Sequence, residues 1–164
     1  MTEPWPYNLP IFRRTHRALS PDGAEVAEIG NAWEVSMSNP TRGTLELSSG
    51  LYLEGCNPSF IWSDDSRFLA VPRYFLRLGL FRRQRMAIID VPARRVFLSP
   101  EAAFYFQPQS FDDGILVATA EPVRKPKQVQ WRLPEDLTRF SELRGAWTSP
   151  PGTRPRTRGA GKTS

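Results

Sequence analysis

The sequence predicts an all-β fold built from three antiparallel repeats of four strands each. A turn motif recurs three times, with its aspartate at Asp22, Asp65 and Asp113, so that the copies are 43 and 48 residues apart. Repeats of this length are typical of folds in which one supersecondary unit stacks on the next. Between the turns lie short runs rich in Val, Ile, Phe, Trp and Thr, bounded by Pro, Gly, Asp and Asn, which is the pattern of strands and turns. The 16 prolines among 164 residues also favour short segments over long helices.

The first repeat is expected over about 17–48. Its turn, Ser20-Pro21-Asp22-Gly23, suits a sharp reversal because Asp bonds its own backbone and Gly accepts a positive φ. Polar and apolar residues alternate in two of its strands, which predicts that these strands are half-buried. The expected strands lie near 17–19 and at 26–29, 32–37 and 44–47, with a link at 39–43.

The second repeat is expected over about 58–100. The run Met86-Ala87-Ile88-Ile89 has no polar alternation, which predicts a strand in the middle of a sheet that is covered on both faces. The expected strands lie at 59–62, 67–71, 86–91 and 96–98, with the turn at 63–66 and a hairpin link at 92–95.

The third repeat is expected over about 102–143. The spacing of Leu137, Phe140 and Leu143 also allows a short helix within 135–144 in place of the last strand. The expected strands lie at 103–106, 115–119, 128–133 and 137–140, with the turn at 112–114 and a link at 134–136.

A family resemblance is carried mainly by the second repeat. It reads Phe60-Ile61-Trp62-Ser63-Asp64-Asp65-Ser66-Arg67-Phe68-Leu69-Ala70-Val71, followed by Met86-Ala87-Ile88-Ile89-Asp90-Val91. This resembles the blade repeat of TolB-type and related WD-repeat-like β-propellers, which has a Trp-Ser-Pro-Asp-Gly turn, an apolar strand and a strand that ends in Asp. The first repeat matches the turn but lacks the Trp. The resemblance covers about 17–143 and implies three propeller-like blades.

Three blades are too few to close, because propellers typically have four to eight. The fold implied is therefore an open or partial propeller or a curved sheet. Its free edges invite pairing with another chain. Three arrangements satisfy them: a curved sheet capped by the termini, a small sandwich, or a homodimer that completes six blades.

One β domain is expected over 1–148, followed by a disordered basic tail over 149–164. The length suits a single core. The net charge of +5 comes mostly from the tail, whose four basic side chains leave 18 basic against 17 acidic groups in the rest. Low apolar content predicts that the tail stays disordered. The N-terminal segment is apolar enough to cover a sheet edge, through Trp5, Tyr7, Leu9, Ile11 and Phe12.

A cytoplasmic location with no membrane contact is expected. No run approaches the roughly 18 to 20 apolar residues of a membrane-spanning helix. The first residues lack the basic and apolar regions of a secretory signal. The lone Cys56 cannot form an internal disulfide, which agrees with a reducing compartment.

We expect no catalytic residue, cofactor or metal. The carboxylate pairs at 64–65 and 112–113 could serve acid–base chemistry or calcium binding, but their turn role explains them. His16 is the only imidazole, and neither a second ligand nor a base–nucleophile spacing accompanies it. We interpret Cys56 as a buried residue that fills space in the core, because free Cys is among the residue types most often buried. The Gly161-Lys162-Thr163 triplet lacks the following helix that a phosphate loop needs.

The candidate partner-binding site is an insertion at 72–85 of the second repeat. Eight arginines lie between 67 and 95, against one acid, Asp90. Arginine beside aromatic residues is typical of interface anchors, and the same mixture can hold phosphates and stack bases. A third interpretation is a long β-hairpin with solvated arginines. The expected partner-binding residues are Arg73, Tyr74, Phe75, Arg77, Arg82, Arg83 and Arg85.

The function expected is that of a non-catalytic protein–protein interaction module. One concrete form is a bacterial immunity-type protein that neutralises a cognate toxin. The alternative is a nucleic-acid-binding protein that uses the arginine-rich loop 73–85 and the basic tail. A second alternative is a hydrolase-like enzyme with a site between repeats, drawn from Asp64, Asp65, His16 or glutamates.

Overall fold

The computed structural model describes residues 16–34, 41–77, 81–122 and 125–147. Over these residues the chain forms two antiparallel sheets and one short helix, and neither sheet closes on itself. The predicted all-β class is therefore confirmed. The N-terminal segment and the basic tail, for which an edge cover and disorder were predicted, lie outside the described residues. Of the helices in the described part of the chain, none has the length and apolar character to cross a membrane.

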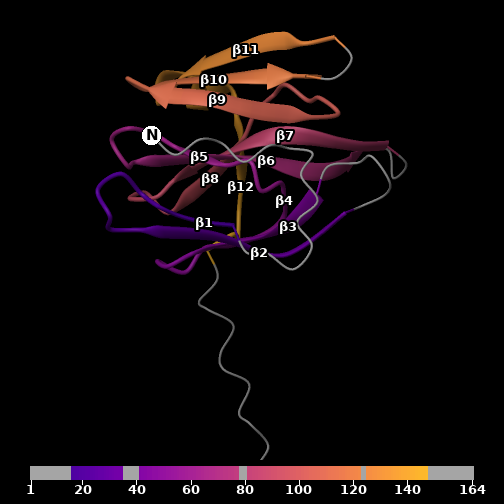
Figure 1. The fold of residues 1–164 in the computed structure, drawn as a ribbon. Coiled ribbons are helices and arrows are strands. Elements are labelled where there is room, and N and C mark those ends of the chain that lie inside the picture. Colours follow the sequence, from indigo (N-terminus) through magenta and orange to yellow (C-terminus); the bar gives the residue numbers. More distant parts are fainter. Residues whose placement is uncertain (1–15, 35–40, 78–80, 123–124, 148–164) are drawn as a thin grey trace, which may run out of the picture.

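The strands form three layers, β1 to β4, β5 to β8 and β9 to β11 (Figure 1). The large sheet runs in the order β1 (His16–Leu19), β2 (Val26–Glu34), β3 (Thr41–Leu47), β4 (Tyr52–Cys56), β6 (Phe68–Arg77), β7 (Phe81–Asp90), β8 (Arg95–Leu98) and β12 (Ser141–Leu143), and β5 (Ile61–Trp62) pairs with β6. The small sheet runs β11 (Lys127–Arg132), β10 (Ile115–Ala120) and β9 (Phe106–Asp112), and the 3₁₀ helix η1 (Glu135–Arg139) leads into β12.

Strands β6 and β7 are buried on both faces because successive side chains of a strand point to opposite sides. Leu69, Val71, Ala87 and Ile89 enter a core shared with β1 to β4. Phe68, Ala70, Met86 and Ile88 enter a second core shared with β9 to β11. All eight are at most 2% exposed. The predicted double-sided burial of the 86–89 run is confirmed, and each large aliphatic side chain contributes about 1.5–3 kcal/mol by burial.

The large sheet folds back on itself between β4 and β6. These two strands share a single residue pair, Cys56 with Arg73, so little holds the two halves in one plane. The first core lies between them, with Leu45 and Leu53 from one half packed with residues of the other. Cys56 belongs to this core and is fully buried.

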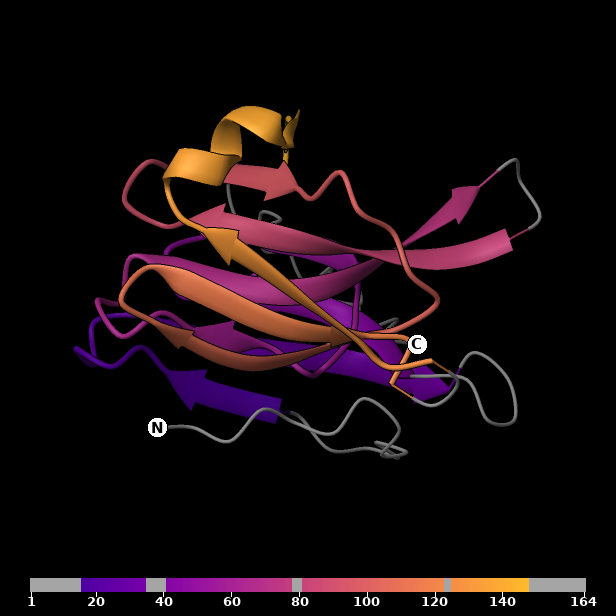
Figure 2. The same ribbon diagram turned by 90° about the horizontal axis from the view of Figure 1, so that it is seen from above.

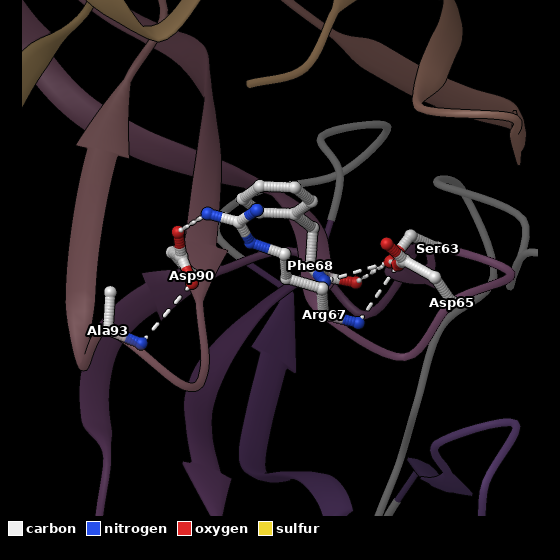
Figure 3. Close-up of polar contacts among 6 residues, drawn as sticks. All are labelled: Ser63, Asp65, Arg67, Phe68, Asp90 and Ala93. Carbon is white, nitrogen blue, oxygen red and sulfur yellow. Dashed lines mark hydrogen bonds and ion pairs between the residues drawn. The ribbon is translucent and has the colours of Figure 1, made fainter.

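The turn of the second repeat is built by two side chains that bond the backbone (Figure 3). The Ser63 hydroxyl donates to Asp65 Oδ1 at 2.6 Å, and that oxygen accepts Arg67 N at 3.0 Å. Ser63 Oγ also accepts Phe68 N at 2.8 Å. Arg67 Nη2 then donates to Asp90 Oδ2 at 2.9 Å, which ties the turn to the end of β7. This network satisfies a buried amide where the strand begins.

The first repeat has the same turn, 43 residues earlier. Ser20 Oγ donates to Asp22 Oδ1 at 2.6 Å, the same oxygen accepts Ala24 N at 3.0 Å, and Ser20 Oγ accepts Glu25 N at 2.9 Å. The fourth residue of the turn has a positive φ in both copies, 74° at Gly23 and 64° at Ser66. The predicted equivalence of these two turns is confirmed.

The third turn is different, and the prediction that it repeats the other two is wrong. Asp113 and Gly114 have φ values of 50° and 71°, and they join β9 directly to β10 as a two-residue hairpin. Such loops favour Asp-Gly because both positions need positive φ. A Cβ on Gly114 would lie 2.7 Å from the Leu133 carbonyl oxygen, so no larger residue fits there without a shift of the backbone.

Other boundaries in the first and third repeats also differ from the prediction. The strands expected at 26–29 and 32–37 are joined in one strand, β2, as far as Glu34, and residues 35–37 lie outside the described part. The unpredicted β4 completes the first layer. Of the strand expected at 103–106, Ala103 forms a single bridge with Gln84, and Phe106 begins the unpredicted longer strand β9. The strand expected at 137–140 is replaced by η1, as the helix alternative allowed, and Asp136 Oδ2 accepts Arg132 N at 2.7 Å as the chain turns away from β11. In the second repeat the four strands lie where they were expected, with β6 and β7 longer.

Replacing Ser63 with Ala should lower the free energy of unfolding by about 1–3 kcal/mol, because it leaves the buried Phe68 N–H unpaired. Ser20→Ala should cost less, since its partner Glu25 N lies in a more exposed turn. Ser49→Ala is the control, because Ser49 is exposed, and it should change stability by less than about 0.5 kcal/mol. Urea unfolding checks this, and equal losses for Ser63 and Ser49 would contradict it.

Cys56 should resist thiol reagents in the folded protein. Burial raises the pKa of the Cys56 thiol from 9.0 to about 12, and the thiolate is the species that reacts. At pH 8 we expect native labelling to be at least about 100-fold slower than labelling in denaturant. A Ser49→Cys variant supplies an exposed thiol as the control. Rapid native labelling of Cys56, followed by mass spectrometry, would show that the first core is open.

Candidate functional site

The predicted insertion is the continuation of β6 and β7 past the body of the protein. The two strands stay paired from Phe68 with Asp90 to Arg77 with Phe81. Their far end projects beyond the other strands (Figure 2). The two paired strands of the predicted hairpin are found at 72–77 and 81–85, and residues 78–80 lie outside the described part. We call the projecting part, Arg73–Arg77 with Phe81–Arg85, the arm.

The pairing of the arm places four of the seven predicted residues on one face. Arg73 lies opposite Arg85, and Phe75 lies opposite Arg83. Directly paired residues of an antiparallel ladder share a face, so Arg73, Phe75, Arg83 and Arg85 lie together. Tyr74 pairs with Gln84 on the opposite face. Arg77 and Arg82 are in β6 and β7, and their side chains lie outside the described part of the structure.

Cation–π contacts hold two of these arginines. Arg85 Cζ lies 5.0 Å from the centre of the Phe75 ring, and Arg83 Cζ lies 4.6 Å from that of Phe104. Such contacts contribute about 0.5–1 kcal/mol at exposed sites. Phe104 was not among the predicted site residues. It reaches the arm because the neighbouring Ala103 bridges to Gln84, a pairing between distant residues that no local pattern signals.

We name Arg73, Phe75, Arg83, Arg85 and Phe104 the cationic face. Among the described residues, the ion pairs within 4.0 Å are made by Arg67, Arg95 and Arg139. None of the three arginines of the cationic face therefore lies that close to a carboxylate oxygen. Arg73 Nε donates to the Glu54 carbonyl oxygen at 3.0 Å. The Nε of Arg85 is buried and has no hydrogen-bond partner in the described chain. These arginines thus have no ion-pair partner among the described residues, and the carboxylate beside the face is that of Glu121, which accepts Phe104 N at 2.7 Å.

Tyr74 supports the base of the arm. Burial raises the pKa of its hydroxyl, and Gln84 and Asn57 are its hydrogen-bond neighbours. Gln84 is fully buried and accepts Phe106 N at 2.7 Å through its side-chain oxygen. The arm is therefore anchored to the body through the face opposite the cationic face.

In the first of the two carboxylate pairs, Asp64 and Asp65 bind backbone amides of the turns. Asp64 Oδ1 accepts Asp65 N at 2.9 Å and Asp64 Oδ2 accepts Asp113 N at 3.0 Å. Hydrogen bonds from Ser20 and from Ala24 N lower the pKa of Asp22. The described ranges contain no group of three or more His, Cys, Asp or Glu side chains placed to hold a metal ion.

His16 and Cys56 occupy packed positions. The His16 ring lies 4.7 Å from the Phe60 ring, centroid to centroid, and burial lowers the pKa of His16. Cys56 is fully buried, and its Sγ donates to the Leu53 carbonyl oxygen at 3.4 Å. A substrate has no access to the Cys56 thiol in this structure, so a Cys–His nucleophile pair does not form here.

The chain was compared with protein-family models, with curated proteins and with solved structures, and none of the three comparisons gave a match.

Proposed function

We propose that this protein is a non-catalytic binding module that holds an acidic segment of a protein partner on the cationic face of the arm. The observation that carries the proposal is the set of three guanidinium groups, on Arg73, Arg83 and Arg85, with no carboxylate oxygen within 4.0 Å of them in the described residues. A folded protein usually neutralises clustered charge internally or uses it on a partner. Arginine offers a carboxylate two parallel hydrogen bonds.

Exposed apolar side chains beside the arm support a protein partner. Among the described residues, the large apolar side chains that stand exposed are Leu19, Leu76 and Phe104. Leu76 is 63% exposed on the face of the arm opposite the cationic face, and Phe104, against Arg83, is 38% exposed. Arginine and aromatic residues are enriched at interface hot spots.

The ring contacts favour an acidic peptide over a single-stranded nucleic acid. Stacking of a base needs an open aromatic face. The Phe75 and Phe104 rings are each covered on one side by a guanidinium group, and Tyr74 is half-buried. A nucleic acid would then be bound through its phosphates alone, and the affinity of such binding falls steeply as the salt concentration rises. Nucleic-acid binding is therefore an outcome that the experiment below distinguishes.

The repeated turn supports the view that the first two layers are copies of one blade-like unit, and the open sheet edges leave room for a homodimer. One form of the proposal is a bacterial immunity-type protein in the cytoplasm. Such a protein blocks a toxin by binding it, without catalysis, and a surface whose charge is complementary to that of the toxin favours this binding.

The test reverses the charge of the cationic face in an Arg73→Glu, Arg83→Glu, Arg85→Glu variant. The control reverses Lys125, Lys127 and Arg132, which are exposed at or beside β11. Fluorescence anisotropy is measured with a labelled peptide of alternating Glu and Leu. The wild type and the control should bind it, and the arm variant should bind at least about tenfold more weakly, because charged hydrogen bonds contribute about 1.5–3 kcal/mol each.

A milder variant with Gln at the same three arm positions separates lost charge from lost folding, which circular dichroism monitors in parallel. Equal peptide binding by the arm variant and the control would refute the role of the cationic face. Tighter binding of a labelled single-stranded DNA, with an affinity that falls steeply as salt rises, would favour the nucleic-acid alternative.

A further inference from the structure

Strand β11 is the outer edge of the small sheet (Figure 1). The strands that end the two described sheets are β1, β12, β9 and β11. Strand β12 has three residues, and β9 carries Pro108 at a bulge and accepts Asp64 N at the Phe111 carbonyl oxygen. A short strand, a proline and a bulge each keep an edge from pairing with another chain. The open edges of the described chain are therefore β1, with four residues, and β11, with six.

Alternate residues of β11 direct their backbone groups away from the sheet. Leu133 N donates to the Gly114 carbonyl oxygen at 2.7 Å, and the register of β10 with β11 continues from this pair. In an antiparallel ladder every second residue bonds the neighbouring strand, and the residues between point the other way. The outward-facing residues of β11 are therefore Gln128, Gln130 and Arg132.

The outward backbone groups are free at two of these three residues. Arg132 N already donates to Asp136 Oδ2 at 2.7 Å, so this end of the edge is capped. Among the described residues, the backbone N–H groups of Gln128 and Gln130 have no hydrogen-bond partner. The edge thus offers its free donors and acceptors on either side of Val129.

The side chains of this edge match a second copy of the same strand. In an antiparallel pair about a two-fold axis at Val129, Gln128 lies opposite Gln130 of the second copy, and Val129 lies opposite Val129. Both glutamines are exposed and uncharged, and Val129 is half-buried against the second core. Lys127 lies opposite Trp131, so no like charges, which would oppose the pairing, face each other.

We propose that β11 pairs with β11 of a second copy of this chain, in the register centred on Val129. Gln128 and Gln130 of the second copy exchange both backbone hydrogen bonds, and the two small sheets become one continuous sheet. The two Val129 side chains extend the apolar packing of the second core across the pair. This inference rests on the homodimer of the proposed function, whose edge it names, and it is separate from the arm.

The first test is sedimentation equilibrium of the full chain. We expect dimers to form between about 10 µM and 1 mM, because a single strand pair buries less than the roughly 1,200 Å² of stable complexes. Gln130→Pro should weaken the dimer at least about tenfold, since each copy loses an outward N–H. The pairing with β10 stays intact, because proline is tolerated on an edge strand where its nitrogen faces outward.

Arg17→Pro is the matched control, because it closes the other open edge in the same way. Ser20 N donates to the Glu25 carbonyl oxygen in the register of β1 with β2, which makes Arg17 an outward-facing residue of β1. This variant should dimerise as the wild type does. Circular dichroism checks that both proline variants remain folded.

Cysteine variants test the register without proline. Val129→Cys brings two thiols together at a non-hydrogen-bonded pair, where the Cα atoms lie about 4.5 Å apart, within the range of a disulfide. Oxidised glutathione should link this variant to itself at least about tenfold faster than Gln130→Cys, whose thiol faces Gln128. Cys56 is fully buried and does not compete.

Three results would overturn the proposal: a wild-type chain that stays monomeric up to about 1 mM, a dimer that is weakened by Arg17→Pro and not by Gln130→Pro, or faster linking of Gln130→Cys than of Val129→Cys. The first would leave the β11 edge to an extended segment of another protein. Charge reversal of the arm should leave the dimer unchanged, so the loss of acidic-peptide binding and the loss of the dimer are separate observations.

Discussion

The burial of β6 and β7 on both faces is the constraint on which the rest of the structure depends. Their side chains alternate between two cores, so a layer of strands must cover each face. The arm is the same strand pair continued beyond those layers. Its position is therefore set by the core, and Gln84, fully buried and bridged to Ala103, marks where the body ends. A rigid support of this kind lowers the entropic cost of presenting arginines to a partner.

Side chain–backbone bonds align the three layers at the other end. Ser66 Oγ accepts Asp22 N at 2.9 Å, and Asp64 Oδ2 accepts Asp113 N at 3.0 Å, so each turn contacts the next. Residues of β1, β5 and β9 line one cleft at this end.

The sequence predicted what depends on local chemistry. The unbroken apolar run at 86–89 and the Ser-x-Asp turns both have local causes, and both are found. The prediction for the third turn was wrong because the sequence Asp113-Gly114 also suits a two-residue hairpin loop. Strand β4 escaped notice because Gly55, with a φ of 77°, reads as a loop residue. The contact of Phe104 with the arm depends on a pairing between distant residues, which one sequence does not reveal. Whether an arginine has an ion-pair partner likewise depends on residues far apart in the sequence, and only the described structure shows that Arg73, Arg83 and Arg85 have none within it.

Hydrogen exchange measured residue by residue tests the central claim most directly. If β6 and β7 are the doubly covered centre, the amides of 69–71 and 86–89 should exchange only through global unfolding, and should be the slowest in the chain. The amides of Phe75 and Arg83, in the arm, should exchange at least about 100-fold faster through local opening. Protection that is uniform along both strands, or slower exchange in the arm than in 86–89, would contradict the account.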